Sequence, residues 1–232
     1  MPDGFRLPRR AMAIFAHPDD VDFGCSGTIA LWTSLGVHVT YCLLTSGNKG
    51  THDPKMTAKR IAAIREKEQQ EAGRRIGVEA FVFLRHDDGE LETGLTLRGE
   101  VCRAIREHQP DLVFCQDPWR PYQMHPDHRV AGWSALDGII AARDHLFFPE
   151  QLKRGLLTHH RVSRVLLFGT TEPNLWFDIN STMRAKLDAL AAHTSQVGQF
   201  SRLASRMHAF AASTGRAWGL ERAEAFRYME LA

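Results

Sequence analysis

The stretch that decides the fold is residues 11–44, AMAIFAHPDDVDFGCSGTIALWTSLGVHVTYCLL. It opens with an apolar run at 11–15 and then turns through the polar segment 17–20. A helix is predicted over about 26–35, followed by a run rich in β-branched and aromatic residues at 37–44. A strand, a helix and a second strand in this order form the unit from which parallel sheets are built.

The same alternation continues along the rest of the chain. Apolar runs predict further strands at 81–84, 111–115 and 162–169. The spacing of apolar residues predicts helices over 57–76, 97–108, 126–142, 181–192 and 200–213. A terminal element at 223–231 has no clear type. We therefore expect an α/β, Rossmann-like fold with a mostly parallel sheet and helices on both faces, as a single domain over residues 1–232.

Composition excludes several classes of protein. The 232 residues include 29 basic and 27 acidic ones, a net charge of +2 spread along the chain, which is no footprint for nucleic acid. No run of about 20 apolar residues predicts a membrane span, and the first ten residues lack the apolar core of a signal peptide. The widely spaced cysteines favour buried thiols over disulfides: Cys25, Cys42, Cys102 and Cys115. We predict a soluble cytoplasmic protein.

Two short acid–histidine segments carry the chemistry. The first, HPDD at 17–20, directly follows the first predicted strand, and the second, HPDH at 125–128, lies one loop beyond the fourth. The carboxyl ends of parallel strands gather at one edge of a sheet, where ligands bind at the point of reversed strand order. We expect the two segments to meet there, although more than 100 residues separate them.

These residue types suit a catalytic metal. Such a site keeps three protein ligands and an open position, and one imidazole and one carboxylate from the first segment plus one imidazole from the second supply the set. Spacing does not decide which aspartate binds, so the other can act as general base in metal-assisted hydrolysis. The spare histidine, His125, could stabilise the oxyanion or protonate the departing amine, with Asp127 orienting its ring.

Other metal functions fit the same ligands. Two histidines and one carboxylate could hold Fe(II) in an oxygenase, or a structural metal in a non-catalytic sugar-binding module. The spare aspartate and histidine favour hydrolysis, because an oxygenase needs open positions for oxygen and cosubstrate rather than a base.

At these residues the sequence resembles the LmbE-like, or PIG-L, family of zinc-dependent de-N-acetylases. The resemblance spans about residues 11–200. Its motifs are Ala16 to Asp20, Gly24 to Thr28, Thr45-Ser46-Gly47, Arg65 to Glu68 before Gly77-Val78, Asp88 to Leu91, His125 to Arg129, Lys186, and His193 to Gln196.

The resemblance implies a zinc ion held by His17, Asp20 and His128. It implies Asp19 as the general base, and His125 as the group that stabilises the oxyanion and assists departure of the amine. The resemblance also implies roles for three residues around these groups.

Asp127 would tune His125, while Arg65 and Asp88 would contact the substrate sugar or its attachment. Some relatives carry a tyrosine two residues before the first histidine of the second motif. Here Gln123 occupies that position and Tyr122 lies one residue earlier, so a transition-state contact from that tyrosine is not carried over.

Members of the family act on N-acetylglucosamine linked to inositol, phosphatidylinositol, malate or another sugar, and related enzymes cleave thiol or glycopeptide conjugates. We therefore expect a zinc-dependent amidase that removes an N-acetyl group from such an amino sugar, a small-molecule substrate. An amidase acting on a thiol or glycopeptide conjugate and an Fe(II)-dependent oxygenase are the alternatives. Relatives often associate, so a homo-oligomer is a further expectation.

Overall fold

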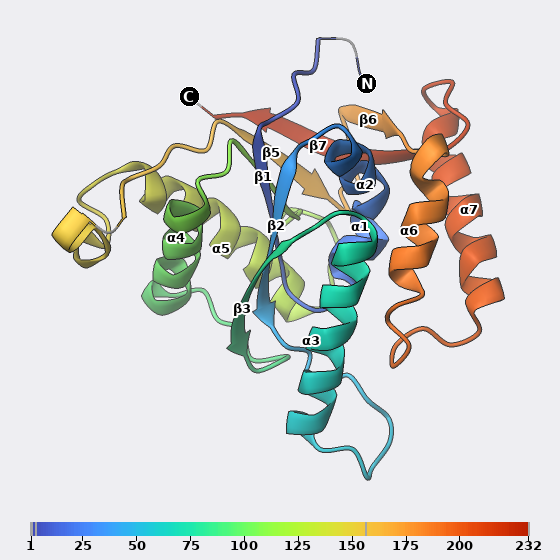
Figure 1. Cartoon of the computed structure of the whole chain (residues 1–232), viewed down its shortest axis with the longest axis horizontal. Helices are drawn as coiled ribbons and strands as arrows, with labels where there is room; N and C mark the ends of the chain where they lie inside the picture. Colours follow the sequence, from blue (N-terminus) through green and yellow to red (C-terminus); the bar gives the residue numbers. More distant parts are fainter. Residues whose placement is uncertain (1, 3, 156, 232) are drawn as a thin grey trace.

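A central sheet of seven strands forms the middle of the molecule (Figure 1). The computed structural model describes residues 2, 4–155 and 157–231. The strand order is β3-β2-β1-β4-β5-β7-β6. The strands span Arg10–Phe15 (β1), His38–Thr45 (β2), Ala80–His86 (β3), Leu112–Gln116 (β4), Arg164–Phe168 (β5), Leu175–Asp178 (β6) and Ala223–Glu230 (β7).

Five neighbouring strands, β3 through β5, are parallel, whereas β7 runs antiparallel to β5 and β6 antiparallel to β7. The order reverses between β1 and β4, because successive strands are added first on one side of β1 and then on the other. The predicted α/β fold with a mostly parallel sheet is confirmed. The terminal element is a strand, and the short strand β6 was not expected.

Helices cover both faces of the sheet, also as predicted (Figure 1). One face carries α4 (Leu95–His108) and α5 (Pro126–Arg143). The other carries α1 (Asp20–Gly24), α2 (Ser26–Ser34), α3 (Ala58–Arg75) and α6 (Met183–Leu190). Outside these lie α7 (Phe200–Arg216), which packs on α6, and the 3-10 helices η1 (Pro149–Gly155) and η2 (Asn180–Thr182).

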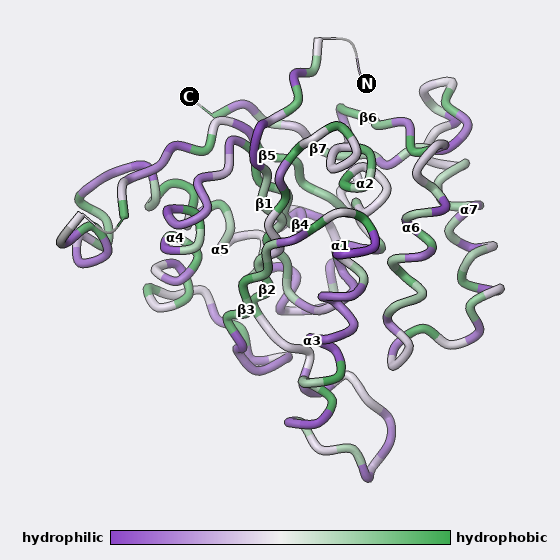
Figure 2. Tube along the Cα trace, in the orientation of Figure 1, coloured by the Kyte–Doolittle hydropathy of each residue, from purple (hydrophilic) through white to green (hydrophobic). Residues whose placement is uncertain are grey.

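The alternation of side chains along β1 feeds both layers of the core. Ala13 and Phe15 point into the cluster that includes α2 and α3, while Met12 and Ile14 point into the cluster under α4 and α5. A strand buried on both faces is apolar throughout rather than alternating. Figure 2 shows this as hydrophobic colouring along the central strands.

A close helix–strand contact brings α5 to the edge of the sheet. A Cβ built on Gly132 would lie 2.5 Å from the backbone oxygen of Gln116 at the end of β4. Only glycine permits this approach without a shift of the backbone. The contact fixes the first turns of α5, which carry the second acid–histidine segment, against the carboxyl end of β4.

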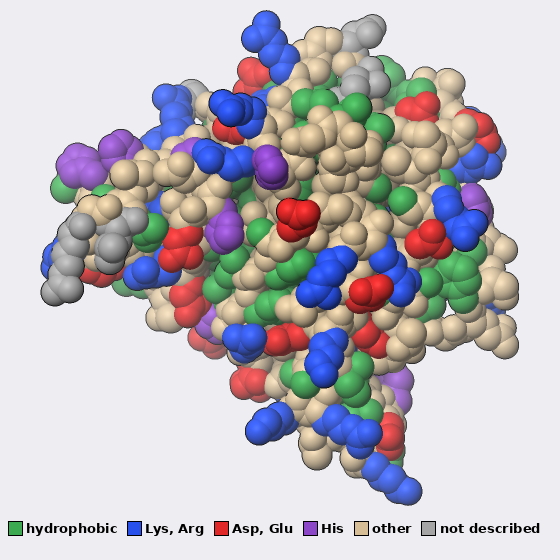
Figure 3. Space-filling model, viewed as in Figure 1, with side chains coloured by type: hydrophobic (Ala, Val, Ile, Leu, Met, Phe, Trp, Pro, Cys, Tyr) green, Lys and Arg blue, Asp and Glu red, His purple; other side chains and the backbone are tan. Residues whose placement is uncertain are grey.

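Basic and acidic side chains are interspersed over the face drawn in Figure 3. Among the residues that the structure describes, no helix combines the length and apolar character needed to cross a membrane.

Candidate metal centre

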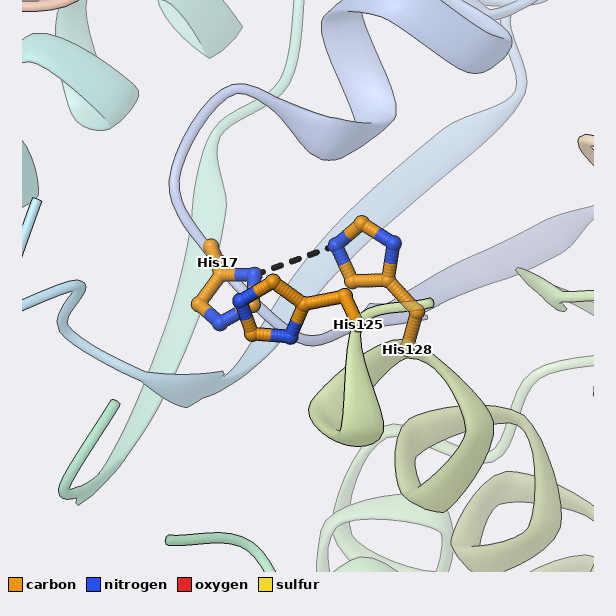
Figure 4. A group of neighbouring side chains, drawn as sticks. All are labelled: His17, His125 and His128. Atoms are coloured by element: carbon orange, nitrogen blue, oxygen red, sulfur yellow. Dashed lines mark hydrogen bonds between the residues drawn. The ribbon is translucent and has the colours of Figure 1, made fainter. Parts of the chain in front are cut away.

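The two acid–histidine segments meet at the carboxyl edge of the sheet, where the strand order reverses. His17 follows the end of β1 by two residues, while His125 is the N-cap of α5 and His128 lies in its first turn. Figure 4 shows the three rings converging from these two segments. The expectation that residues far apart in sequence would share one site is confirmed in its geometry.

The three predicted ligands lie within contact of one another. Nδ1 of His17 is 3.2 Å from Nε2 of His128 and 3.3 Å from Oδ2 of Asp20. The other carboxylate oxygen of Asp20, Oδ1, lies 3.1 Å from Nε2 of His128. Two imidazole nitrogens and one carboxylate therefore face a common point, which is a donor set that suits a metal ion.

Further side chains capable of binding a metal crowd the same point. Donor atoms of His17, His125 and His128 all lie within 4.8 Å of one another, as do those of a second set that joins His17 and His125 to Asp88 and Asp127. Asp20 belongs to neither of these two sets, but its carboxylate contacts both His17 and His128 at 3.1 to 3.3 Å. His125 is also the most exposed of the three histidines, and its Nδ1 already accepts a hydrogen bond from the backbone.

The cluster attracts positive charge. Burial on its own would lower the pKa of His17, but bonds to Asp127, Asp20 and Asp88 outweigh burial and raise the pKa to about 11. Burial also disfavours the ionised form of Asp20, yet bonds to His128 and His17 hold the pKa of Asp20 well below its ordinary value. A site with three carboxylates around one imidazole is electrostatically suited to a bound cation.

Asp127 supports His17 rather than His125, which corrects the expected pairing. Its Oδ2 lies 2.9 Å from Nε2 of His17, and the backbone N–H groups of Gly89 and Leu91 donate to the same carboxylate at 2.6 and 3.2 Å. The N-cap geometry of α5 explains the difference, because the Nδ1 of His125 turns back to accept from the backbone N–H of Asp127 at 3.3 Å. The helix start thus uses the His125 ring as a cap and leaves the Asp127 carboxylate for His17.

Asp19 occupies a strained turn beside the ligands. Its φ of 93° lies in the positive region that non-glycine residues seldom adopt, a conformation that costs about 1–3 kcal/mol and persists only where the surroundings enforce it. Burial and then the charge of Asp20 raise the pKa of Asp19 to about 7, while the charge of Arg65 acts in the opposite direction. The turn directs Asp20 to the histidines and Asp19 to Arg65.

Arg65 is buried under this turn instead of lining an open surface. Its guanidinium donates to the backbone oxygens of Pro18 at 2.7 Å and Gly47 at 3.1 Å, and to Oδ2 of Asp19 at 3.3 Å. Only 4% of the residue is exposed. The structure therefore gives Arg65 a role in holding Asp19, and a direct sugar contact from Arg65 does not follow from its position.

Asp88 lies on the far side of His17. Its Oδ1 is 3.2 Å from Nε2 of His17 and 4.0 Å from Nε2 of His125, and its backbone N–H donates to Asn48 at 2.8 Å. The bond to His17 lowers the pKa of Asp88 against the opposing effect of burial. Asp88 therefore contacts the candidate metal ligand His17 directly, a contact that the sequence did not indicate.

Two glutamines complete the site, and neither was predicted. Oε1 of Gln116 accepts from the backbone N–H of Ala16 at 3.1 Å, and its Nε2 donates to Oδ2 of Asp20 at 3.1 Å. Gln69 on α3 accepts from the backbone N–H of Asp19 at 2.8 Å. A polar residue at the end of the apolar strand β4 was the available signal for Gln116.

An open cavity of about 820 Å³ begins at the cluster and extends toward α7. Asp20 and His128 line one end. Trp176 is half-buried and lines the cavity, and its ring centroid lies 4.3 Å from that of Trp218. Tyr122 is 96% exposed, so its side chain is not packed against the protein, and its φ is 57°.

Comparison with known proteins agrees with this geometry. The sequence pattern of the PIG-L family, described as GlcNAc-PI de-N-acetylase, matches residues 12–137, which is more than half of the chain. A diacetylchitobiose deacetylase of Thermococcus kodakarensis is 35% identical over 192 residues, covering 83% of this chain and 72% of the relative. A probable N-acetyl-alpha-D-glucosaminyl L-malate deacetylase 2 of Bacillus anthracis is 28% identical over 193 residues, covering 81% of each chain.

The fold is shared with a solved relative as well. The structure of N,N′-diacetylchitobiose deacetylase from Pyrococcus horikoshii, complexed with its inhibitor MPG, superimposes with a TM-score of 0.91 at 33% identity. The match covers 97% of this chain and 87% of that one. Both the matched sequence pattern and this similarity include the two acid–histidine segments, and the chain belongs to the PIG-L (LmbE-like) family of de-N-acetylases.

Proposed function

We propose that this protein is a zinc-dependent hydrolase that removes the N-acetyl group from an N-acetylglucosamine-type amino sugar or its conjugate. The observation that carries the proposal is the bonding of His17. One ring nitrogen faces His128 and Asp20, while the other is bonded to Asp127. Metal-ligating histidines have this arrangement, with the outer N–H donated to a carboxylate. The deacetylase relatives support hydrolysis of an N-acetyl amide.

The donor set fits zinc held by His17, Asp20 and His128. Two ligands about 2.1 Å from a tetrahedral zinc ion lie about 3.4 Å apart, and the three residue pairs here approach to 3.1 to 3.3 Å, His17 through Oδ2 of Asp20 and His128 through Oδ1. Three protein ligands leave a position open, as in catalytic zinc sites. When bound, the ion supplies Lewis acidity toward the amide carbonyl and lowers the pKa of a water toward about 7.

Asp19 is proposed as the general base. A base works best when its pKa lies near the operating pH, and burial with the charge of Asp20 raises the pKa of Asp19 to about 7. Arg65 holds the carboxylate at 3.3 Å. Asp19 accepts a proton from the attacking water as the new carbon–oxygen bond forms.

His125 is proposed as the group that stabilises the oxyanion and so assists departure of the amine. Its Nδ1 accepts from the backbone of Asp127, which leaves Nε2 to donate. Burial lowers the pKa of His125, and the positive charges of His17 and His128 lower it further, which favours the neutral ring with its proton on Nε2. The Nε2–H of the neutral ring donates a hydrogen bond to the developing oxyanion, and the proton that Asp19 took from the water passes to the amine nitrogen as the carbon–nitrogen bond breaks, which yields acetate and the free amine.

The cavity beside the cluster is proposed to take the rest of the substrate. Its volume of about 820 Å³ exceeds the needs of an acetamido group and falls in the range of sites for larger ligands. Trp176 and Phe210 offer aromatic surface to a sugar ring or its substituent, and Arg120 and Arg206 offer positive charge. Substrates that differ in size and in negative charge are therefore the ones to compare.

Release of acetate tests the proposal. Protein stripped of metal and reloaded with zinc is offered N-acetylglucosamine, N,N′-diacetylchitobiose and N-acetylglucosaminyl malate, the last of these carrying negative charge. We expect zinc to restore acetate release from at least one sugar, equally in air and without oxygen. Turnover that requires Fe(II) and oxygen would identify the oxygenase instead. Bound zinc without turnover of any amide would identify a non-catalytic module.

The Asp19→Ala variant tests the base. We expect it to lose nearly all turnover while it binds close to one zinc per chain. Asp188→Ala, on the exposed face of α6, is the matched control and should keep full turnover. Wild-type turnover in Asp19→Ala would refute the assignment of the base.

We also propose a compartment, on the basis of the cysteines. Cys25, Cys42, Cys102 and Cys115 are all buried free thiols. Unpaired thiols suit a reducing environment, which supports the cytoplasm as the proposed location.

A further inference from the structure

A chain of buried polar side chains lies beneath the strained turn at Asp19. Gln69 on α3 accepts from the backbone N–H of Asp19 at 2.8 Å and donates from Nε2 to Oδ2 of Asp22 at 2.8 Å. The same Oδ2 lies 2.9 Å from Nε2 of His193, which follows α6. The three links connect α3, α1 and the end of α6 to one backbone amide.

This chain is isolated from solvent and from the cavity. Asp22, Gln69 and His193 are each 0% exposed. None of the three lines the cavity that begins at Asp20 and His128. Their effect on the reaction must therefore pass through the residues that they hold.

The bonding pattern fixes the direction of Gln69. Because the Asp22 carboxylate can only accept, it orients the amide nitrogen of Gln69 toward itself and the amide oxygen toward Asp19. His193 in turn holds Asp22 through the shared oxygen. A glutamate at position 69 would set a second carboxylate against Asp22, so the neutral amide is the group that can join the two aspartates.

The turn needs this support. A φ of 93° at Asp19 is retained only where neighbours enforce it. Arg65 holds the preceding carbonyl of Pro18 at 2.7 Å, and Gln69 holds the Asp19 N–H. Both come from α3, one helical turn apart, so one face of α3 sets the backbone on each side of this peptide.

We propose that Gln69 is a positioning residue, oriented by Asp22 and His193, that sets the backbone of Asp19 so that its carboxylate lies in place to act as the base. The inference rests on the proposed function, because it assigns Gln69 a role through the base. It means that residues on α3 and after α6, outside the two acid–histidine segments, help to hold the proposed base in place.

Gln69→Leu removes both bonds at similar volume. We expect kcat for acetate release from N,N′-diacetylchitobiose to fall about 10- to 100-fold, since a misplacement of about 1 Å can cost that much. KM and zinc content per chain should stay within about twofold of the parent values. Gln70→Leu, the same change one residue along the helix, is the control and should keep full kcat. Unchanged kcat in Gln69→Leu would overturn the proposal.

A double-mutant cycle separates positioning from a general loss of stability. If Gln69 acts through Asp19, adding Gln69→Leu to Asp19→Asn should cost less than about twofold in residual kcat. A full further loss in that background would contradict the proposal. Wild-type turnover in Asp19→Asn alone would instead refute the assignment of Asp19 as the base, which belongs to the proposed function, so the two failures are distinguishable.

Two further measurements keep the test decisive if Gln69→Leu folds poorly or turnover is too slow. His193→Leu should lower kcat, whereas His193→Gln, whose amide can still donate to Asp22, should restore most of it; equal losses would overturn the role of His193. A crystal structure of Gln69→Leu should show Asp19 outside the positive φ region. Retention of φ near 93° in that variant would overturn the proposal without reference to activity.

Discussion

The carboxylate of Asp127 lies 2.9 Å from Nε2 of His17, the ring nitrogen opposite the one that faces His128. This bond fixes which nitrogen of His17 carries the proton and turns the other toward the cluster. The carboxylate is itself held by backbone N–H groups of Gly89 and Leu91. The support of the metal centre thus reaches from α5 through the loop after β3 to the end of β1.

Asp127→Asn should weaken metal binding while the three proposed ligands remain. Loss of a carboxylate behind a ligating histidine costs about 10- to 100-fold in metal affinity. Competition with a chelator measures the zinc dissociation constant directly. Asp137→Asn, an exposed change on the same helix, should leave the affinity unchanged. Parent affinity in Asp127→Asn would show that the bond to His17 does not support the metal.

Asp20→Ala and His125→Ala distinguish the two possible ligand sets. If the ligands are His17, Asp20 and His128, Asp20→Ala loses stoichiometric zinc and His125→Ala keeps it while losing turnover. The physical reason is that Asp20 contacts both histidines at 3.1 to 3.3 Å, whereas Nδ1 of His125 is used as the helix cap. Elemental analysis of gel-filtered protein gives the answer. The reverse pattern would establish a three-histidine site.

Arg65→Gln should shift the pH dependence of catalysis. The Arg65 charge lowers the pKa of Asp19, which burial and Asp20 have raised to about 7. Without that charge the pKa of Asp19 rises further, and the base works only when ionised. The acid limb of kcat/KM therefore moves to higher pH, and activity is lost first on the acidic side. Arg60→Gln, exposed on the same helix, is the control; an unshifted acid limb in Arg65→Gln would disconnect Arg65 from the base.

The central fold could be predicted from the sequence because each parallel strand is a local apolar run and helices separate it from the next parallel strand along the chain. The strand β6 could not, since Leu175–Asp178 gains its pairing only from β7, almost 50 residues later. Its four residues carry too little pattern to distinguish a strand from a loop. The reversal of direction at β7 likewise depends on tertiary pairing with β5.

The meeting of the two acid–histidine segments followed from topology, because strand ends gather at one edge of a parallel sheet. The partners of individual side chains did not. Asp127 turned to His17 because the first turn of α5 used the ring of its neighbour as a cap. Gln69 could not be predicted because an uncharged glutamine on a helix has no chemical signature until its partners are known, and the one signal for Gln116 was its polarity at the end of an apolar strand.

Gly132→Ala should destabilise the protein and the site together. Its new methyl group would lie 2.5 Å from the backbone oxygen of Gln116 and 2.9 Å from the ring of Pro118, so α5 must move away from β4. Overpacking of this kind costs about 1–3 kcal/mol, against which the better helix propensity of alanine returns up to about 1 kcal/mol. We expect a net loss that lowers Tm by a few degrees, since each 1 kcal/mol shifts Tm by about 2–4 °C at this size.

Metal affinity should fall with stability in Gly132→Ala, because Gln116 bonds to Asp20 and α5 carries His128. Thermal melts with and without zinc measure both effects in one experiment. Gly198→Ala has open space around the added methyl group and serves as the control, with Tm and zinc affinity close to the parent values. A Gly132→Ala protein with parent Tm and parent zinc affinity would show that the spacing between α5 and β4 does not set the geometry of the metal centre.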